Sequence, residues 1–556
     1  MTDEKKYNVI GKVVSSLEKV LPMRGPSESI YSSVMLKNEC LNFQLAFQSN
    51  EEGTSVRNYI KVEGSLAKYI TLRYVENVPV RIMPEGTDDY YIGDIPGMFP
   101  DILKPVSPLG FVLPFGQWRS IWVQLECAEG LPVGEHNITF ILCNANNEEV
   151  MRLSHLVQVV DATLEETDFP FTNWMHYDCI CEWYKVEPFT DEFYAVFEQY
   201  LEAYLRSGGN MLLVPLFTPP LDTAIGGERK TVQLVDVELQ EDIYSFDFTK
   251  LKKFLCFILE RGIRYIEFSH LFTQWGGCAC PKIMVKVDGT EKNLFGWAVA
   301  STSNEYKKFL KNFLPKLVEI IEDFHIKESC YIHLTDEPHE KDAATYEECA
   351  RFIKQYTDGI KIMDAISQPV FYQKALVDVP VVYIPAVPLF EVVERKNLFV
   401  YYCGGPTNEY FSNRFINMPS LRTRIIGTQL YQTGVSGFLH WGFNFYNSYL
   451  SLERVNPYAV TDAGYFYPAG DGFIVYPTDK GVDMSIRAEL QYEALQDYRL
   501  LKTLEKLSDR AYVLKILNEY AIDGFREYPK EETSFFAFRQ RIISEIGRKQ
   551  DEKMAD

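Results

Sequence analysis

Two acidic residues, Asp336 and Glu337, stand side by side directly after the apolar segment Tyr331-Ile332-His333-Leu334-Thr335 and before Pro338. Neighbouring carboxyls beside low-dielectric walls repel each other, so their titrations couple and one proton is held to a higher pH than normal. A carboxyl that keeps its proton near neutral pH can act as a general acid. An acidic dipeptide that merely caps the next helix is the structural alternative. The catalytic interpretation therefore requires that residues 330–335 form a strand ending at a pocket.

The elements that would position this pair begin after residue 170, where short apolar segments alternate with helical patterns. This alternation predicts a parallel sheet with right-handed crossovers. Eight strands are predicted, enough to close a (β/α)8 TIM barrel, over 171–177, 210–215, 265–270, 330–335, 361–365, 381–385, 398–403 and 437–441. Helices are predicted over 191–206, 249–261, 305–324, 345–356 and 420–433. No Gly-rich phosphate turn follows the first strand, which argues against an open dinucleotide-binding sheet.

The regions on either side of the barrel have different patterns. Before residue 165, segments such as 41–47, 118–125 and 136–142 alternate with period two between polar turns, which predicts antiparallel strands. After residue 480 the pattern is helical, starting with 486–507. The sequence therefore predicts a multidomain α/β protein in three parts. These are an all-β N-terminal β-sandwich over 1–165, a catalytic (β/α)8 barrel over 166–480 and a C-terminal helical extension over 481–556 packed on the barrel.

Composition narrows the choice of partners and compartment. A net charge of -21 makes nucleic acid and anionic membranes poor partners. No apolar run is long enough to span a bilayer, and Met1 to Tyr7 lead into no apolar signal segment. Most of the eleven cysteines sit inside apolar runs, as reduced thiols do. We expect a cytoplasmic monomer or homodimer.

The spacing of the acidic pair bears on its chemistry. Consecutive residues of an extended chain point to opposite faces, so Asp336 and Glu337 are poorly arranged to flank one glycosidic bond as nucleophile and acid. They suit a reaction in which the 2-acetamido oxygen of the substrate is the nucleophile. One carboxyl would protonate the glycosidic oxygen while the other holds the acetamide N–H. This scheme retains configuration through an oxazoline intermediate and needs no metal or organic cofactor.

Other polar and aromatic residues gather at the predicted strand ends, where barrel enzymes place their sites. Trp275, Trp441 and Tyr402 could lie against the apolar face of a sugar or the acetamide methyl, or could simply pack under the rim. Tyr383, Tyr402 and Tyr446 could each donate to the acetamide oxygen.

The remaining candidates for sugar binding are His176, Asp178, His270 and Asn444. His176 and Asp178 lie two residues apart and could bind sugar hydroxyls or brace the barrel mouth. Asn444 could bind a hydroxyl or cap its own loop.

Taken together, these segments resemble glycoside hydrolase family 123, whose members include β-N-acetylgalactosaminidases. The resemblance is carried by 174–179, His270 with 275–276, 333–338, 401–403, 440–444, 470–477, 485–487 and 497–498. It implies that Asp336 orients the acetamide and that Glu337 acts as acid and then base. It also implies an N-terminal β-sandwich and, as substrate, an N-acetylgalactosamine-containing glycan or glycolipid-derived oligosaccharide. The choice between galacto and gluco sugars, and between exo and endo action, stays open.

Three alternatives remain. A separate carboxylate, Glu267, Asp178 or Asp364, could act as a covalent nucleophile, with Glu337 still the acid. The chain could instead bind carbohydrate without catalysis. A metal-dependent hydrolase using His176, Asp178, His270 and His333 is the third. Cys179 with Cys181 and Cys278 with Cys280 are too tightly spaced for a usual zinc site.

Overall fold

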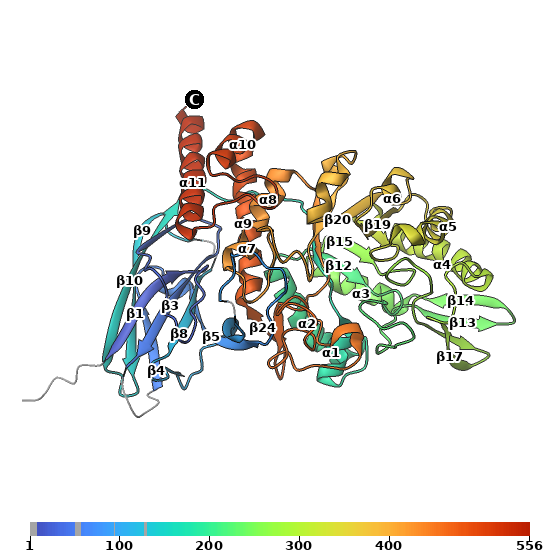
Figure 1. Ribbon diagram of the computed structural model, residues 1–556, viewed down its shortest axis with the longest axis horizontal. Coiled ribbons are helices and arrows are strands. Elements are labelled where there is room, and N and C mark those ends of the chain that lie inside the picture. The colour runs from blue at the N-terminus through green and yellow to red at the C-terminus, as the bar shows by residue number, and fades with distance from the viewer. Residues whose placement is uncertain (1–7, 51–56, 94, 127–129, 556) are drawn as a thin grey trace, which may run out of the picture.

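The structure is a computed structural model that describes residues 8–50, 57–93, 95–126 and 130–555. Residues 1–7, on which the expectation of no secretory signal depends, lie outside these ranges. Antiparallel sheets occupy one side of the molecule and a parallel barrel with its helices occupies the other (Figure 1). Among the described helices, none combines the length and the apolar character needed to cross a bilayer.

Two sheets form the N-terminal side. One has the strand order β1-β3-β8-β5-β6-β24-β23 and the other β2-β10-β9-β4-β7. Their N-terminal strands are β1 (Val9–Ser15), β2 (Ser32–Leu36), β3 (Leu41–Ser49), β4 (Arg57–Glu63), β5 (Ile70–Val80), β6 (Gly97–Pro105), β7 (Phe111–Val112), β8 (Trp118–Leu125), β9 (Gly134–Asn144) and β10 (Glu149–Val160). All pairings in these sheets are antiparallel except that of β10 with β2. Buried residues of both sheets share one hydrophobic cluster, in which Phe43 of β3 meets Phe140 of β9 at 5.8 Å between ring centroids.

Eight parallel strands form the barrel, in the order β11-β22-β21-β20-β19-β18-β15-β12. They are β11 (Phe171–Asn173), β12 (Met211–Val214), β15 (Tyr265–Phe268), β18 (Cys330–His333), β19 (Lys361–Ile366), β20 (Val379–Tyr383), β21 (Phe399–Tyr401) and β22 (Gly437–His440). Each coincides with one of the eight predicted strands, with shifted ends. The spatial order follows the chain order around a ring, so the prediction of an eight-stranded parallel barrel is confirmed.

The barrel is nearly closed, because β11 and β12 do not form a ladder. Asn210, just before β12, bridges this gap. Its backbone N–H donates to the carbonyl of Phe171 at 3.1 Å, its side-chain oxygen accepts from the N–H of Phe171 at 2.8 Å, and its amide donates to the carbonyl of Phe169 at 3.0 Å. The side chain therefore satisfies backbone groups that a ladder would otherwise pair.

Strand residues alternate between the barrel interior and the layer under the helices. In β21, Phe399 and Tyr401 belong to the interior cluster, whereas Val400 belongs to the outer cluster beneath the helices. Both faces of the strands are buried, which explains why they read as continuous apolar runs rather than as alternating ones. The alternation decides which side chains at the strand ends can reach a pocket.

Helices cover the outside of the barrel. They are α1 (Tyr177–Tyr184), α2 (Asp191–Arg206), α3 (Thr249–Glu260), α4 (Asn304–Asp323), α5 (Ala343–Lys354), α6 (Val370–Gln373), α7 (Ser420–Arg424) and α8 (Ile426–Thr433). The helix predicted over 420–433 is divided into α7 and α8. A small sheet of β14 (Ile243–Asp247), β13 (Asp236–Gln240), β16 (Ile283–Val287) and β17 (Thr290–Phe295) lies in the segments after β12 and β15, at the far end of the molecule in Figure 1.

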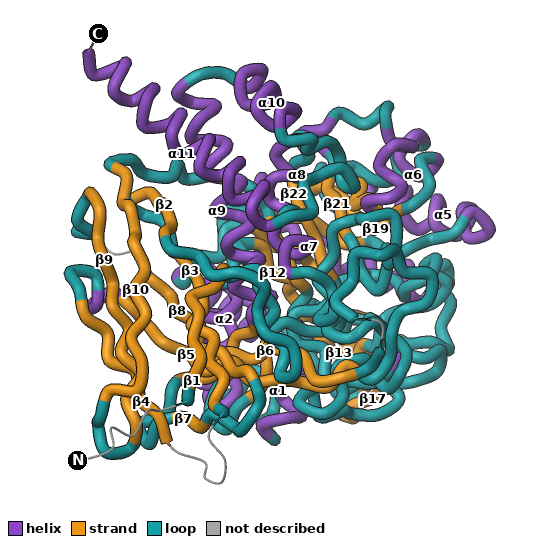
Figure 2. Tube along the Cα trace, turned by 60° about the vertical axis from the view of Figure 1, so that its left-hand side comes forward, coloured by secondary structure: helices purple, strands orange, loops and turns teal. Residues whose placement is uncertain are grey.

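The chain returns to the N-terminal side after the barrel. Strands β23 (Val475–Pro477) and β24 (Val482–Ser485) join the first sheet through pairing of β24 with β6. Three helices follow, α9 (Ile486–Leu507), α10 (Arg510–Glu519) and α11 (Glu532–Ala555) (Figure 2).

Helix α9 carries buried carboxylates that are paired on several sides. Glu489 lies 2.7 Å from Arg73 of the first sheet, and Glu493 lies 2.6 Å from Arg424 of α7. Asp497 pairs with Arg424 at 2.8 Å as well as with Arg539 of α11 at 2.5 Å. Because breaking a buried ion pair is costly, α9 fixes the first sheet, the barrel and α11 relative to one another.

Candidate active site

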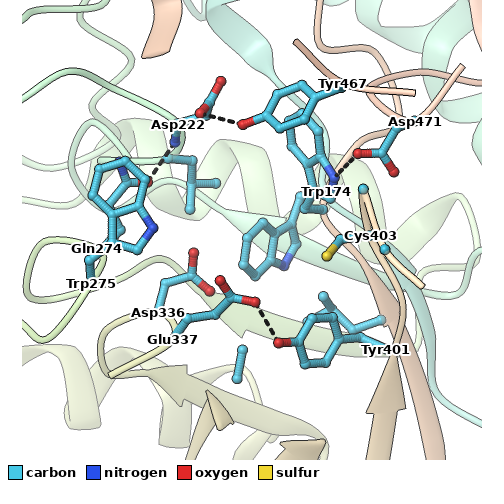
Figure 3. A pocket seen from close by; sticks show the side chains of 16 residues that line it. Trp174, Asp222, Gln274, Trp275, Asp336, Glu337, Tyr401, Cys403, Tyr467 and Asp471 are labelled. Carbon is cyan, nitrogen blue, oxygen red and sulfur yellow. Dashed lines mark hydrogen bonds between the residues drawn. The ribbon is translucent and has the colours of Figure 1, made fainter. Parts of the chain in front are cut away.

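A cavity of about 200 Å³ opens at the carboxyl ends of the barrel strands. Seven of the eight strands, or the segments after them, contribute to its wall, as do residues of the loop before β23 (Figure 3). The lining consists of Trp174, Leu221, Asp222, Gln274, Trp275, Asp336, Glu337, Ala365, Tyr401, Cys403, Gly404, Gly405, Leu439, Trp441, Tyr467 and Asp471. Carboxylates and aromatic rings dominate this wall, a composition suited to a polar ring compound.

Asp336 and Glu337 both point into this cavity (Figure 3). They can do so although they are consecutive, because Glu337 has a left-handed backbone with φ 46° and the chain turns there instead of continuing extended. The turn is fixed from both sides. Trp275 donates its N–H to the carbonyl of Asp336 at 2.7 Å, and Glu337 donates its N–H to the carbonyl of Ala365 in β19 at 3.1 Å. Such backbone strain is typical of functional sites.

The two carboxyls have different surroundings. The hydroxyl of Tyr401 donates to Oε1 of Glu337 at 2.5 Å. Burial and the neighbouring charge of Glu337 raise the pKa of Asp336 well above its usual value, although the charge of His333 opposes this shift. The surroundings of Asp336 therefore favour its protonated form.

A buried charge network lies beneath the pair. His333 of β18 lies 2.7 Å from Oε1 of Glu267 and 3.4 Å from Oδ1 of Asp364. Burial alone would lower the pKa of His333, but hydrogen bonding and charge from Asp364 and Glu267 raise it to about 10. Oδ2 of Asp364 accepts from both the N–H and the hydroxyl of Thr335, at 3.0 and 2.8 Å. The network thus anchors the residue that directly precedes Asp336.

Trp174 forms part of the pocket wall and connects it to this network. Its indole Nε1–H donates to both carboxylate oxygens of Glu267, at 2.9 and 3.1 Å. Its ring contacts His270 and His333 edge to face, at centroid distances of 5.0 and 5.3 Å. The orientation of the indole is therefore fixed before any ligand arrives.

The opposite wall carries two more carboxylates (Figure 3). Asp222 accepts from the hydroxyl of Tyr467 at 2.7 Å, and Asp471 accepts from Nε1–H of Trp441 at 3.0 Å. Burial raises the pKa of Asp222, and it raises that of Asp471 to about 7. These groups offer fixed acceptors for the hydroxyls of a bound ring.

The segment that forms this site also matches a known family. The model described as glycoside hydrolase 123, catalytic domain, matches residues 174–504. The chain belongs to glycoside hydrolase family 123. This confirms the resemblance seen in the sequence and makes the protein a glycoside hydrolase.

A solved family 123 structure agrees with this assignment. The enzyme from Clostridium perfringens, whose structure is described in terms of glycolipid glycan hydrolysis, has a TM-score of 0.73 and 14% identity, with 99% of each chain covered. This likeness shows the shared fold. Solved β-glucuronidases from Parabacteroides merdae and Bifidobacterium dentium reach a TM-score of 0.32, at 11% and 8% identity. They cover 89% and 87% of this chain and 52% and 66% of their own. No curated protein matches the chain.

Four of the predicted site residues of this family 123 chain line the pocket: Asp336, Glu337, Trp275 and Trp441. Tyr383 lies at its edge, with its ring centroid 5.5 Å from that of Tyr401.

His176 and Asp178 lie beside the pocket, and both side chains contact the guanidinium of Arg229. Asp178 accepts from Nη2 and Nε of Arg229 at 2.6 and 2.7 Å, and Nδ1 of His176 is 3.0 Å from Nη2. Asn444 is bonded to the backbone of His176 through both ends of its amide, at 2.8 and 3.1 Å. His176 and Asp178 thus have the surroundings of the structural alternative stated for them, bracing the barrel mouth, whereas Asn444 is bonded to residue 176 and does not cap its own loop.

Two predicted tyrosines point away from the pocket. Tyr402 belongs to the outer cluster, with its ring 5.1 Å from Phe438, and Tyr446 donates its hydroxyl to the carbonyl of Val475 at 3.1 Å. Neither lines the cavity. The tyrosine that contacts Glu337 is Tyr401, which precedes Tyr402 and faces inward.

His270 lies under the pocket, 4.0 Å from His333 between ring centroids, and its two nitrogens have no hydrogen-bond partner among the residues that the structure describes. Within the described part of the chain, His270, His333 and Asp336 form the one group of potential metal ligands, with one atom of each within 4.8 Å of the others. His333 fits this role poorly. As an imidazolium directed at Glu267 and Asp364, it has no free lone pair for a metal.

The opposite wall of the pocket was not predicted from the sequence. Asp222, Gln274 and Tyr467 lie in long loops without a strand to locate them, and Asp471 lies in a segment that only the family resemblance had marked. The Gly-Asp-Gly pattern around Asp471 was the available signal.

Proposed function

We propose that this protein is a retaining glycosidase that releases β-linked N-acetylhexosamine, N-acetylgalactosamine first, by substrate-assisted catalysis. The observation that carries the proposal is the placement of Asp336 and Glu337 in one cavity. Glu267, Asp178 and Asp364, the carboxylates considered as separate nucleophiles, do not line that cavity and are bonded to Trp174, Arg229 and Thr335. This arrangement favours the acetamide of the substrate as nucleophile.

In the first step the acetamide oxygen attacks the anomeric carbon, and the bond from that carbon to the glycosidic oxygen breaks. Glu337 gives its proton to the leaving oxygen. Asp336 accepts a hydrogen bond from the acetamide N–H and stabilises the positive charge that develops on the oxazolinium ion. In the second step water attacks the anomeric carbon, Glu337 takes its proton, and the acetamide is restored.

Substrate binding would also decide which of the two carboxyls, Asp336 or Glu337, carries the proton. Burial and the charge of Glu337 raise the pKa of Asp336 and so favour its protonated form. An acetamide N–H that donates to Asp336 favours its anion. The proton then belongs on Glu337, beside the glycosidic oxygen, where Tyr401 already fixes the carboxyl.

The rest of the pocket suits one amino sugar. Trp174, Trp275 and Trp441 offer apolar faces, and Asp222 and Asp471 offer acceptors for hydroxyls on the opposite wall. The Clostridium perfringens relative is described as acting on glycolipid glycans, which supports a glycan or a glycolipid-derived oligosaccharide as substrate.

The test compares nitrophenyl β-glycosides of N-acetylgalactosamine, N-acetylglucosamine and galactose. We expect cleavage of the first two, with the galacto sugar preferred, and no cleavage of galactose, which lacks the acetamide. Asp336→Asn should cripple formation of the intermediate. Glu337→Gln should lower turnover by about 10²- to 10⁴-fold for a poor leaving group.

Three outcomes would overturn the proposal. Equal cleavage of galactoside and N-acetylgalactosaminide, or labelling of a carboxylate by a 2-fluoro sugar, would indicate a covalent nucleophile. Binding of the sugars without turnover, unchanged in Glu337→Gln, would indicate a carbohydrate-binding protein.

A further inference from the structure

Arg414 is a fully buried arginine in the segment between β21 and α7, and it contacts the backbone of the pocket residue Asp471. Its guanidinium donates to the side-chain oxygen of Asn173 at 2.6 Å, to the carbonyl of Asp471 at 3.0 Å and to the carbonyl of Gly442. These three acceptors are neutral. A buried cation is costly unless an anion compensates its charge, so the guanidinium favours an anion nearby.

His440, at the end of β22, lies between Arg414 and the carboxyl of Asp471. Its Nδ1 accepts from Nη2 of Arg414 at 2.6 Å and from the N–H of Gly442 at 3.0 Å. A guanidinium and a backbone N–H can only donate, so Nδ1 carries no proton. Burial and the charges of Arg414 and Arg487 lower the pKa of His440 well below its usual value, which keeps the ring neutral. The one ring proton therefore lies on Nε2.

Nε2 of His440 faces the carboxyl of Asp471. The distance from Nε2 to Oδ1 is 3.2 Å, while Oδ2 accepts from Nε1–H of Trp441 at 3.0 Å. Nε2 and Oδ1 are both buried, and neither has a hydrogen-bond partner in the part of the chain that the structure describes. The contact is thus close but not aligned, as is common for active-site hydrogen bonds that tighten when substrate binds. Once aligned, it gives the carboxylate a second N–H donor, which favours the anion.

The other groups around Asp471 act in opposing directions. Burial and the charge of Asp222 favour its protonated form, whereas the charges of Arg414 and Arg487 favour its anion. Arg487 is already paired with Asp101 at 2.8 Å, so Arg414 is the cation whose charge is left for Asp471. Burial raises the pKa of four further neighbours and keeps them neutral: Tyr383, Tyr402, Tyr467 and Cys403.

We propose that Arg414 and His440 are positioning residues for Asp471. Together with the N–H of Gly442, Arg414 fixes the tautomer of His440, and Nε2–H of His440 holds Asp471 as the anion that accepts hydroxyls of the bound sugar. The part played by the sugar rests on the proposed function, whereas the tautomer does not depend on it. Asp471 lies on the wall opposite Asp336 and Glu337 (Figure 3), so this arrangement acts on substrate affinity and not on the reacting bond.

The first experiment observes the tautomer in the wild-type protein, labelled with ¹⁵N in its histidine rings. The chain has eight histidines, and the ring signals lost in His440→Asn or His440→Gln are those of His440. We expect a proton on Nε2 and none on Nδ1, unchanged between about pH 6 and 8. A proton on Nδ1, or a ring protonated on both nitrogens, would overturn the inference.

The second experiment measures KM and kcat for nitrophenyl N-acetyl-β-galactosaminide as a function of pH. The wild-type KM should fall as pH rises through about 7, where Asp471 becomes an anion. His440→Asn keeps an acceptor near the position of Nδ1 but loses the N–H beside Asp471. It should move this inflection up by at least about one pH unit, with kcat within about threefold of the wild type. His440→Gln keeps an amide N–H near the position of Nε2 and should leave the inflection near its wild-type pH.

Two more variants separate charge from packing. Arg414→Gln removes the cation and should also move the inflection of KM to higher pH. His155→Asn is the control for a general loss of packing, because His155 of β10 is as fully buried as His440 but lies in the N-terminal sheets. It should lower the unfolding midpoint and leave the inflection in place.

An inflection that stays in place in His440→Asn and Arg414→Gln would overturn the inference. So would an inflection that moves equally in His440→Gln or in His155→Asn. The wild-type spectra, assigned with His440→Gln, and the Arg414→Gln profile keep the test valid should His440→Asn fail to fold. A wild type that does not cleave the glycoside would instead contradict the proposed function, and the ring spectra would still decide the tautomer.

Discussion

The hydroxyl of Tyr401 donates a hydrogen bond to Oε1 of Glu337 over 2.5 Å, and both side chains lie in the pocket at the barrel mouth. Tyr401 comes from the end of β21 and Glu337 from the loop after β18, so the contact crosses the barrel interior. It fixes the carboxyl that we assign as general acid, and it is formed by a tyrosine that the sequence analysis did not select.

Tyr401→Phe should lower kcat/KM about 10- to 100-fold, because a hydrogen bond to a charged group contributes about 1.5–3 kcal/mol. The loss should be greater for an alkyl glycoside than for a nitrophenyl glycoside, since only the former depends on a well-placed acid. Tyr402→Phe is the matched control and should leave kcat/KM within about twofold, because its ring lies outside the barrel. Similar losses in both variants would contradict the role of Tyr401.

The sequence predicted Tyr402 for the pocket, but Tyr401 lines it, and this difference has a physical cause. The predicted strand 398–403 contains two adjacent tyrosines before Cys403, but an apolar strand buried on both faces has no polar alternation to mark its inner side. Which alternate residues of β21 face the barrel interior is set by the strands that pair with β21 in space. Leu439 of β22 and Trp441, which follows the strand, face inward, and Tyr401 pairs with Leu439 in register.

The strands were easier to predict from the sequence than the loops. Eight apolar segments of four to eight residues between helices determine a barrel almost without alternatives. The wall formed by Asp222, Gln274 and Tyr467 depends instead on how long loops return to the pocket. The hydroxyl of Tyr467, for example, meets Asp222 across 245 positions of sequence. No local pattern encodes such a contact.

Glu337→Gly should abolish activity and raise the stability of the fold by about 1 kcal/mol. The gain follows from removing the strain of a non-glycine residue at φ 46° together with the charge beside Asp336. Glu337→Ala is the control, since it removes the charge but keeps the unfavourable φ, and it should gain less. Thermal unfolding of the three proteins measures the difference. A glycine variant no more stable than the alanine variant would show that the turn carries no strain.

His333→Gln should destabilise the protein by about 3–5 kcal/mol, because it leaves Glu267 and Asp364 buried without their cation. The folded-state pKa of His333 is about 10, above its unfolded value, so its contribution to stability is complete below about pH 6.5 and is lost as pH rises through 10. His270→Gln is the matched control, as the ring nitrogens of His270 have no hydrogen-bond partner in the described part of the chain. Equal losses in unfolding free energy at pH 6 would contradict the network.

Chelator treatment should leave turnover unchanged. His270, His333 and Asp336 could surround a cation by distance, but the two ring N–H groups of an imidazolium at His333 face Glu267 and Asp364 instead. Dialysis against EDTA followed by assay on nitrophenyl N-acetyl-β-galactosaminide measures this. Activity that is lost and then restored by one divalent metal would favour the metal-dependent alternative.

Asp471→Asn should flatten the dependence of stability on pH between about 4 and 7. Burial raises the pKa of Asp471 to about 7 despite Arg414 and Trp441, so the folded protein holds a proton that the unfolded chain releases near pH 4. Stability of the wild type therefore falls as pH rises through this window, by up to about 4 kcal/mol for this group. The variant loses that slope and should gain stability relative to the wild type at pH 8.

The Asp471→Asn variant should also bind substrate more weakly above pH 7, since only the anion accepts two hydroxyls. Unfolding midpoints and KM at pH 5 and pH 8 measure both effects, and parallel pH profiles of the two proteins would show that Asp471 does not titrate in this range.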